Sequence, residues 1–257
     1  PSQAVLGRMY EEGIGGEQDP SEANILYRLS AEQGYADAAY LLGRQFCYGR
    51  DTAKNGPAAL KWLTIAADED NTDAQYLGAK ILLTNEIVTA NPELTEKWLM
   101  TAADRGHTQA QLLLGSTMLT ALAGTYDPET GYKSIKQAAD TGLIEAERRL
   151  GDLYNDGLNG QPDHENAIVW WSRAAEKSDA PSQLRLARAH AQGRGTTRDF
   201  QAAYIWASLS ALQGNSHAIT LREKLRARLR PEELEKADMS IATKSKPAEI
   251  ARGGPSS

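Results

Sequence analysis

Histidine and cysteine, the residue types that most often carry metal or nucleophile chemistry, are scarce in this sequence. The histidines lack the spacing of a helical zinc motif such as HExxH; they are His107, His164, His190 and His217. Cys47 is the only cysteine, so neither an internal disulfide nor a cysteine-rich zinc site can form. No nucleophile has a base and an orienting group in a known arrangement. We therefore expect no enzymatic activity, no cofactor and no metal ion.

Glycines and tryptophans could instead form a ligand site. The glycine-rich segments 13–16, 157–160 and 193–195 look like phosphate loops, but a dinucleotide loop must follow a strand and no strand pattern precedes them. We interpret them as turns. Tryptophans can stack on sugars, but four of them are separated by multiples of 36 residues, which indicates a core position: Trp62, Trp98, Trp170 and Trp206. Trp171 stands outside that series and is the candidate for a partly exposed platform.

The period of 36 residues extends along most of the chain. The Leu-Gly pairs Leu6-Gly7, Leu42-Gly43, Leu77-Gly78, Leu114-Gly115 and Leu150-Gly151 recur at this interval, and the sixth pair is Leu186-Ala187. Segments that end a helix recur at 34, 70, 106, 142, 178 and 214. A small residue follows each of them four positions later: Ala38, Ala74, Ala110, Ala146, Ser182 and Ala218. Three registers in agreement predict six repeated pairs of helices.

The residue types in each repeat have a physical reason. A glycine inside a helix costs about 1 kcal/mol relative to alanine, so we expect a bulky side chain to lie on it. The candidates are second-helix aromatics and their neighbours: Tyr27, Trp62, Trp98, Tyr132, Trp170 and Tyr204. The glycine that ends a repeat permits the left-handed backbone of a helix end. Asp or Pro near the start of each second helix matches helix-capping preferences.

The positions of three histidines and the cysteine within the repeat predict their roles. His190 falls at the aromatic position of Tyr10 and Tyr154, which favours a structural role. His107 and His217 follow repeat-ending positions, so we expect them to be exposed. Cys47 lies near the end of a first helix, where the helix dipole does not favour a thiolate, and we expect it to be a packing residue.

Composition restricts the class of protein further. Helix-forming Ala, Leu, Glu, Arg and Gln dominate, and the net charge is −6. That charge disfavours nucleic acid as a partner. No run of about 18 apolar residues predicts a membrane span, and no signal peptide is visible. The chain opens with Pro1 and not Met, so a targeting segment or a lipid anchor could precede it.

These residues resemble the Sel1-like repeat family, a relative of tetratricopeptide repeats, over about residues 3–218. The third and fourth repeats depart from the pattern, because they have Thr84-Asn85-Glu86 and Ala123-Gly124-Thr125 in place of the Gly-x-Gly turn. The resemblance implies an all-α fold: a right-handed α-solenoid superhelix of about six helix-turn-helix repeats. We expect the array over residues 1–218, C-terminal capping helices over 219–242 and a disordered tail over 243–257.

Family members are mostly adaptor proteins, many of them in the bacterial envelope or secreted. The resemblance therefore implies a non-catalytic protein–protein interaction scaffold with other proteins as partners, among them envelope or secretion components. A polysaccharide-export scaffold, such as the lipoprotein of the alginate secretion machinery, is one family member of this kind. The location would then be periplasmic or outer-membrane-associated, with the cytoplasm as the alternative. A secreted or periplasmic glycan- or ligand-binding repeat protein and an antibiotic-hydrolysing repeat enzyme are the other functions to test.

In related repeats the first helices line the concave face. Helical spacing turns the positions three before and one or four after the repeat glycine toward that groove. Arginine and tyrosine are enriched among interface anchors. The hypothesis is that the groove holds an acidic segment of a partner protein through Arg8, Glu11, Tyr40, Arg44, Gln75, Ser116, Arg148, Asp152, Asn155 and Arg188.

Overall fold

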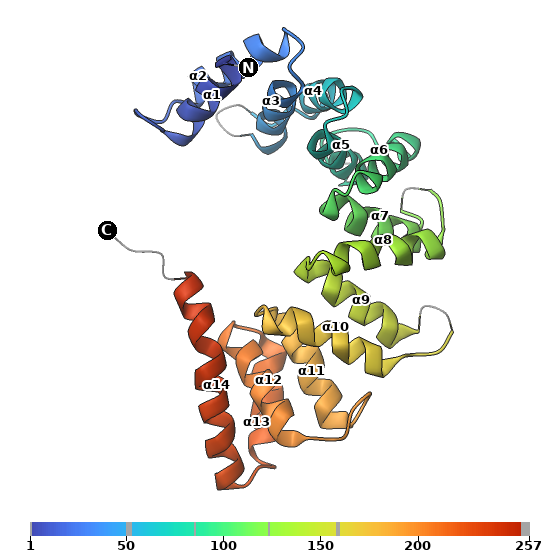
Figure 1. The fold of residues 1–257 in the computed structure, drawn as a ribbon, viewed down its shortest axis with the longest axis vertical. Helices are drawn as coiled ribbons and strands as arrows, with labels where there is room; N and C mark the ends of the chain where they lie inside the picture. Colours follow the sequence, from blue (N-terminus) through green and yellow to red (C-terminus); the bar gives the residue numbers. More distant parts are fainter. Residues whose placement is uncertain (1, 50–52, 85, 123, 158–159, 253–257) are drawn as a thin grey trace. The chain divides into compact units, whose positions relative to one another are not determined.

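The computed structural model describes residues 2–49, 53–84, 86–122, 124–157 and 160–252. Over these residues the chain is all-α, and its fourteen helices follow one another as helix-turn-helix pairs (Figure 1). The all-α repeat prediction is confirmed. The helices are α1 (Ser2–Glu12), α2 (Pro20–Ala31), α3 (Ala36–Tyr48), α4 (Gly56–Asp68), α5 (Thr72–Thr84), α6 (Pro92–Asp104), α7 (Thr108–Thr120), α8 (Pro128–Asp140), α9 (Ile144–Asp156), α10 (His164–Glu176), α11 (Ala180–Gln192), α12 (Phe200–Leu212), α13 (Ser216–Arg226) and α14 (Pro231–Arg252).

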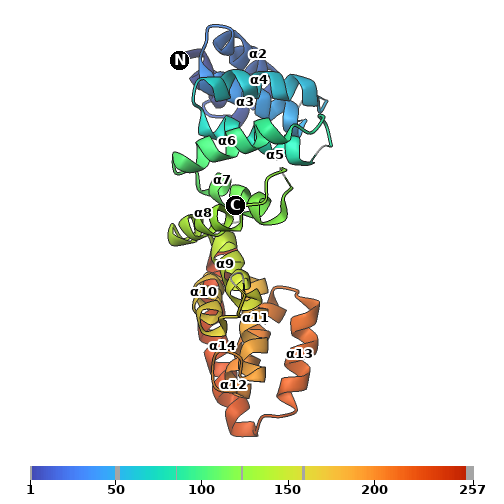
Figure 2. The ribbon, with the colours of Figure 1, turned by 90° about the vertical axis from the view of Figure 1, so that its right-hand side faces the viewer.

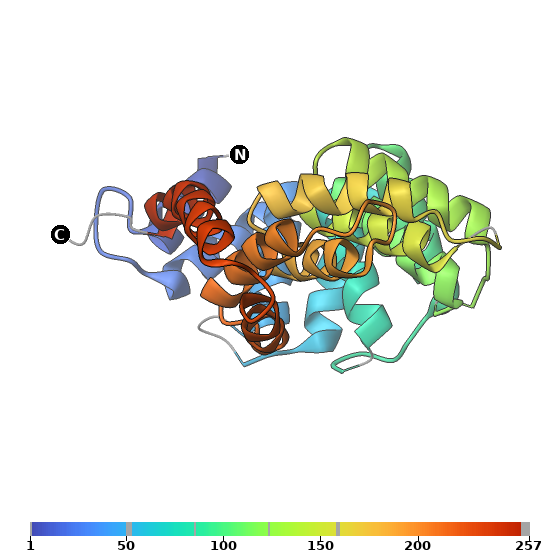
Figure 3. The same ribbon diagram turned by 90° about the horizontal axis from the view of Figure 1, so that it is seen from below.

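The chain divides into two compact units, Pro1–Gln137 and Ala138–Ser257, called here the N-terminal and C-terminal units. In the N-terminal unit each helix packs on the next one along the chain, and α3 also contacts α5. The pairs α3/α4 and α5/α6 lie one above the other in Figure 2. In the C-terminal unit α9 to α13 pack in the same sequential way. The long helix α14, red in Figure 3, contacts α12.

Helix starts follow the 36-residue period. Each second helix begins at a side-chain cap, in which a carboxylate or amide oxygen accepts a backbone N–H three residues later. Such a cap stabilises a helix by about 1 kcal/mol. Four of the first helices also have a side-chain cap, in which an oxygen of Asn71, Asp179 or Asn215, or Nδ1 of His107, accepts the backbone N–H three residues later. The second-helix caps are Asp19, Asn55, Asn91, Asp127, Asp163 and Asp199.

Helix ends follow the same period. All six repeat-ending positions have the left-handed backbone that the sequence predicts. Four of them are glycines, but Asp70 (φ 65°) and Ser178 (φ 67°) adopt this conformation with a side chain. A residue other than glycine pays about 1–2 kcal/mol for it. The period therefore fixes the backbone even where the residue type is unfavourable.

The mid-helix glycines each receive a bulky side chain that lies twenty positions later. An added Cβ on any of them would come within 3 Å of that side chain. The contacting residue is the predicted aromatic itself for Tyr27 and Trp98, and its direct neighbour in the second and fifth repeats, where Trp62 and Trp170 stand one position before it. In the fourth repeat Tyr132 stands three positions before the contacting residue. The observed pairs are Gly7 with Tyr27, Gly43 with Leu63, Gly78 with Trp98, Gly115 with Ile135, and Gly151 with Trp171.

The sixth repeat has a compensated version of this contact. Ala187 replaces the glycine, and twenty positions later stands Ala207, where other repeats have a bulky residue; both alanines are fully buried. A larger first-helix residue is matched by a smaller second-helix residue. The close approach of the two helices is therefore a property of the pair and not of the glycine alone.

Burial confirms most of the predicted core. The six small residues that begin at Ala38 are all 0% exposed, and the Leu-Gly leucines from Leu42 to Leu186 are at most 4% exposed. Leu6 is the exception at 43%, because within the described chain no helix pair packs on the outer side of α1. Cys47 is buried at 8% exposure, as predicted, and burial raises the pKa of its thiol.

Three other expectations need correction. Trp171 is only 6% exposed, because it fills the space above Gly151, so it offers no platform for a sugar. The side chain of His107 is 11% exposed, since Nδ1 caps α7 and Nε2 lies 3.1 Å from Asp73. Helix α14 continues past residue 242, where the sequence analysis begins a disordered tail. It ends at Arg252, and residues 253–257 lie outside the described residues.

Candidate functional site

The predicted binding residues lie on the first helices of the repeats, but many of them already have partners within the chain. Gln75 is 3% exposed and donates to the carbonyl oxygen of Ala67 at 3.1 Å. Ser116 is half-buried and donates its hydroxyl to the carbonyl oxygen of Leu112. The burial of Gln75 removes it from any binding surface.

In the N-terminal unit Glu11 joins α1 to α3. Its carboxylate is 12% exposed and accepts hydrogen bonds from Tyr27 at 2.6 Å, Gln45 at 2.7 Å and Arg44 at 2.9 Å. Burial raises the pKa of Glu11, but these hydrogen bonds and the Arg44 charge outweigh it, so the pKa is lowered. Arg44 also lies over the ring of Tyr40. Glu11 and Arg44 thus tie two neighbouring repeats together.

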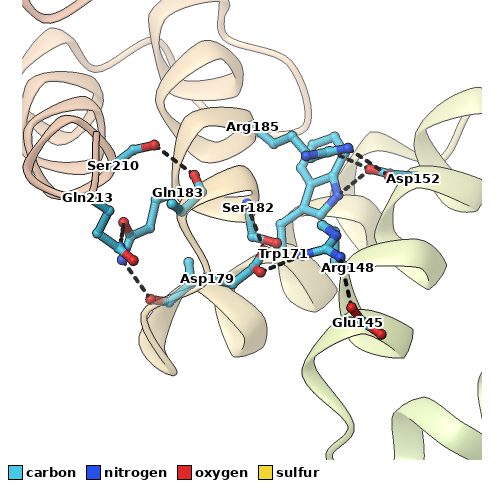
Figure 4. A network of polar contacts seen from close by, with 12 residues as sticks. Glu145, Arg148, Asp152, Trp171, Asp179, Ser182, Gln183, Arg185, Ser210 and Gln213 are labelled. Atoms are coloured by element: carbon cyan, nitrogen blue, oxygen red, sulfur yellow. Dashed lines mark hydrogen bonds and ion pairs between the residues drawn. The ribbon is translucent and has the colours of Figure 1, made fainter. Parts of the chain in front are cut away.

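In the C-terminal unit Asp152 and Arg148 join α9 to the elements beside it (Figure 4). Asp152 accepts a hydrogen bond from Nε1–H of Trp171 at 2.9 Å and two more from Arg185, one from Nε and one from Nη2. Arg148 forms an ion pair with Asp179, which also caps α11. Like Glu11 and Arg44, these predicted site residues hold neighbouring repeats in register.

A polar pocket of about 610 Å³ lies among α9, α10, α11 and the turn after α11. It brings together three predicted residues, Asp152, Asn155 and Arg188. It also contains arginines that the prediction missed. The pocket's charged side chains are Arg149, Asp152, Asp156, Arg185, Arg188 and Arg194.

The sequence carried a signal for the missed arginines. Arg149 and Arg185 stand two positions before Gly151 and Ala187, the repeat-glycine positions of the fifth and sixth repeats. The prediction used only positions three before and one or four after the glycine. At the omitted register the first four repeats have apolar or aromatic residues, and the change to arginine occurs only in the last two: Val5, Leu41, Tyr76, Leu113, Arg149 and Arg185.

The turn after α11 holds Arg194 at the pocket. Gly193 and Gly195 both have positive φ, 71° and 66°. A Cβ on Gly195 would lie 2.2 Å from the carbonyl oxygen of His164, at the start of α10. The turn therefore packs against α10 in a way that only glycine allows. This is the Gly-x-Gly turn of the sequence pattern, and here it positions a cation.

A second hollow, of about 590 Å³, lies in the N-terminal unit between α1, α3 and the start of α5. It contains the predicted residues Arg8 and Tyr40, with Val5, Tyr35 and Leu41 among its apolar walls. Arg8 is exposed and pairs with Glu12 at 3.5 Å. The two units therefore present surfaces of different chemistry: mixed and largely apolar in the first, rich in arginine in the second.

Metal-binding clusters and membrane-spanning helices also bear on the class of protein. Among the described residues, no group of histidine, cysteine and carboxylate side chains has the arrangement of a metal site. In the same part of the chain no helix combines the length and hydropathy needed to cross a membrane.

A protein-family comparison matches the Sel1 repeat over residues 1–35, 36–71, 72–107, 144–179 and 180–215. These matches cover well over half of the chain, which belongs to the Sel1 repeat family. The third repeat is among them although its turn departs from the pattern, whereas residues 108–143, the fourth repeat, are not. A sequence comparison with curated proteins gives no match.

Solved structures show the same fold. A protective antigen of uropathogenic Escherichia coli strains, described as having an SLR fold, is 28% identical with a TM-score of 0.86. The alignment covers 99% of this chain and 56% of the antigen's chain, so this chain spans little more than half of that protein. A Sel1 repeat protein from Oxalobacter formigenes is 23% identical with a TM-score of 0.71, over 81% of this chain and 84% of the other, and supports the fold alone.

Proposed function

We propose that this chain is a non-catalytic scaffold that holds other proteins, with the first-helix surface as its binding face. The observation that carries the proposal is the contrast between uniform packing positions and a varied surface. The position after the repeat glycine holds a different mixture of residues along the array: Arg8, Arg44, Ala79, Ser116, Asp152 and Arg188. Ala79 is buried, and Arg44 and Asp152 pair with residues of a neighbouring repeat. Packing does not dictate Arg8, Ser116 and Arg188, which are exposed or half-buried, so these positions can specify a partner.

The partners we propose are components of a bacterial envelope or secretion complex, such as polysaccharide-export machinery. The similarity to a bacterial protein described as a protective antigen supports this proposal. The periplasm or the outer membrane is the proposed location. The burial of Trp171 removes the feature on which the glycan-binding alternative rested.

The test is capture of partners by immobilised protein from extracts of the native source. The binding-face variant is Arg149→Glu/Arg188→Glu, because neither arginine has an ion pair within the described residues. The matched control is Lys224→Glu/Lys236→Glu, which makes the same charge change at exposed positions of α13 and α14. Arg44 and Arg148 are unsuitable for this test, since reversing their charge would break internal ion pairs.

We expect wild type and control to enrich the same proteins, each then purified and measured for direct binding, and the binding-face variant to lose them. Equal melting temperatures for the three proteins would show that the loss is not unfolding. The proposal is wrong if no purified protein binds the wild type directly.

A further inference from the structure

We infer that the polar pocket among α9, α10 and α11 is an anchoring site for the carboxylate side chains of an acidic peptide segment. The inference rests on the proposed function and names the chemistry of the partner. It also replaces the distributed groove of the sequence hypothesis with one site in the C-terminal unit.

The charges of the pocket favour an anion. Four arginines face two aspartates there, and Arg185 is already occupied by a two-pronged interaction with Asp152. Arg149, Arg188 and Arg194 have no ion pair within the described chain. A guanidinium presents its donors in a planar fork that matches a carboxylate, so three uncommitted forks in one pocket can hold more than one carboxylate. Such a cluster is unexpected in a chain with a net charge of −6.

The remaining lining selects a peptide over a polyanion. The carboxylates of Asp152 and Asp156 repel a densely charged nucleic acid or polyphosphate more strongly than a peptide whose carboxylates are spaced apart, and Asp156 can accept the N–H groups of a peptide backbone. Trp171 and Leu184 also line the pocket, but both are almost fully buried, so they form its floor and the polar side chains make up most of its open surface. A volume of about 610 Å³ accommodates a few side chains and not a whole folded surface.

The pocket is held in shape before any ligand arrives. Asp152 fixes both Arg185 and the Trp171 indole, and the indole lies on Gly151. The turn with Gly195 is packed against the start of α10 and carries Arg194. A site held in this way loses little side-chain entropy when it binds.

The probe is a fluorescein-labelled peptide of alternating glutamate and alanine, with the glutamine-for-glutamate peptide as its control, measured by anisotropy on the full chain. We expect the acidic peptide to bind and the glutamine peptide not to bind. Binding should weaken by about tenfold between about 50 and 500 mM NaCl, because exposed charges are screened. Arg149→Glu/Arg188→Glu should weaken it by more than about tenfold. Lys224→Glu/Lys236→Glu should leave the dissociation constant within about twofold of the wild-type value.

A gain-of-affinity variant excludes misfolding as the explanation. Asp156 is exposed, and its carboxylate accepts a hydrogen bond from the neighbouring Asn155 amide. Asp156→Asn removes a negative charge beside the ligand, so the acidic peptide should bind roughly threefold more tightly. An unfolded variant cannot produce that result.

Three results would overturn the inference. The first is no binding of the acidic peptide. The second is equal binding of the glutamine peptide, and the third is full competition by inorganic phosphate at the peptide's own concentration, which would make the pocket a small-anion site. If the peptide fails while purified partners still bind both wild type and the Arg149→Glu/Arg188→Glu variant, the pocket assignment fails and the scaffold function stands. If no protein binds the wild type, the function itself fails.

Discussion

The contact between Gly151 and Trp171 tests the packing of the repeats, and the variant is Gly151→Ala. The new methyl group would lie 2.4 Å from Cδ1 and 2.6 Å from Nε1 of the indole, well inside ordinary contact at 3.4 Å. The indole cannot withdraw freely, since Nε1 is bonded to Asp152. Overpacking costs about 3 kcal/mol in a site that cannot relax, and alanine returns about 1 kcal/mol of helix propensity. The expected net loss of stability is about 2 kcal/mol.

A double-mutant cycle separates the clash from the propensity. Trp171→Ala removes the indole, and in that background Gly151→Ala should stabilise the protein by about 1 kcal/mol, because only the propensity gain remains. The natural precedent is the buried pair Ala187 and Ala207 in the sixth repeat. Urea unfolding followed by far-ultraviolet circular dichroism measures all four proteins. The reasoning is refuted if Gly151→Ala has the same sign and size in both backgrounds.

Ser178→Gly should stabilise the chain by about 1 kcal/mol, because φ is 67° at a position that favours glycine. The reciprocal Gly214→Ser should destabilise it by a similar amount. Thermal melts in which the two variants do not shift the melting temperature in opposite directions would contradict this. The lowered pKa of Glu11 means that its contribution is present above the unfolded pKa of about 4.3 and is lost as the pH falls through the folded pKa. Glu11→Gln should therefore melt below wild type at about pH 7, with the gap narrowing toward about pH 3; a gap that stays constant over this range would count against the network. Cys47 is buried in the core and burial raises the pKa of its thiol, so a thiol reagent should label it at least about a hundredfold more slowly in the folded protein than in urea. Comparable rates would show that Cys47 is not buried.

The ties between neighbouring first helices are built from different residues in the two units. Glu11 of α1 receives Arg44 of α3 in one, and Asp152 of α9 receives Arg185 of α11 in the other. Each pair is partly buried and supplied with further hydrogen bonds, which a buried charge requires. Ties of this kind set which surface of one repeat faces the next, while the apolar contacts supply most of the stability.

The sequence predicted the helices, their starts and their ends because each of these features recurs at the same position in six repeats. Agreement among six copies is hard to obtain by chance. It misplaced Trp171 because the Trp series at 62, 98, 170 and 206 suggested a core register. The side chain on the glycine instead stands twenty positions after it, one residue beyond Trp170. That offset is set by where two helices cross, which a periodic count along one chain does not reveal.

The binding surface was harder to predict than the fold. Glu11 and Arg148 lie on first helices, but helical spacing could not show that Tyr27 of α2 and Asp179, the cap of α11, would engage them. Partners distant in sequence decide whether a charged side chain is free. Arg149 was missed because the prediction used only the positions three before and one or four after the repeat glycine.

Site-specific photo-crosslinking in the native source tests the central claim most directly. Gln192→benzoylphenylalanine places the crosslinker at the edge of the pocket without removing an arginine, and Lys224→benzoylphenylalanine places it on the exposed side of α13 as the control. The scaffold account predicts a protein adduct at position 192 and not at 224, with the crosslinked peptide rich in aspartate or glutamate by mass spectrometry. No protein adduct at 192, or the same adducts at both positions, would contradict it.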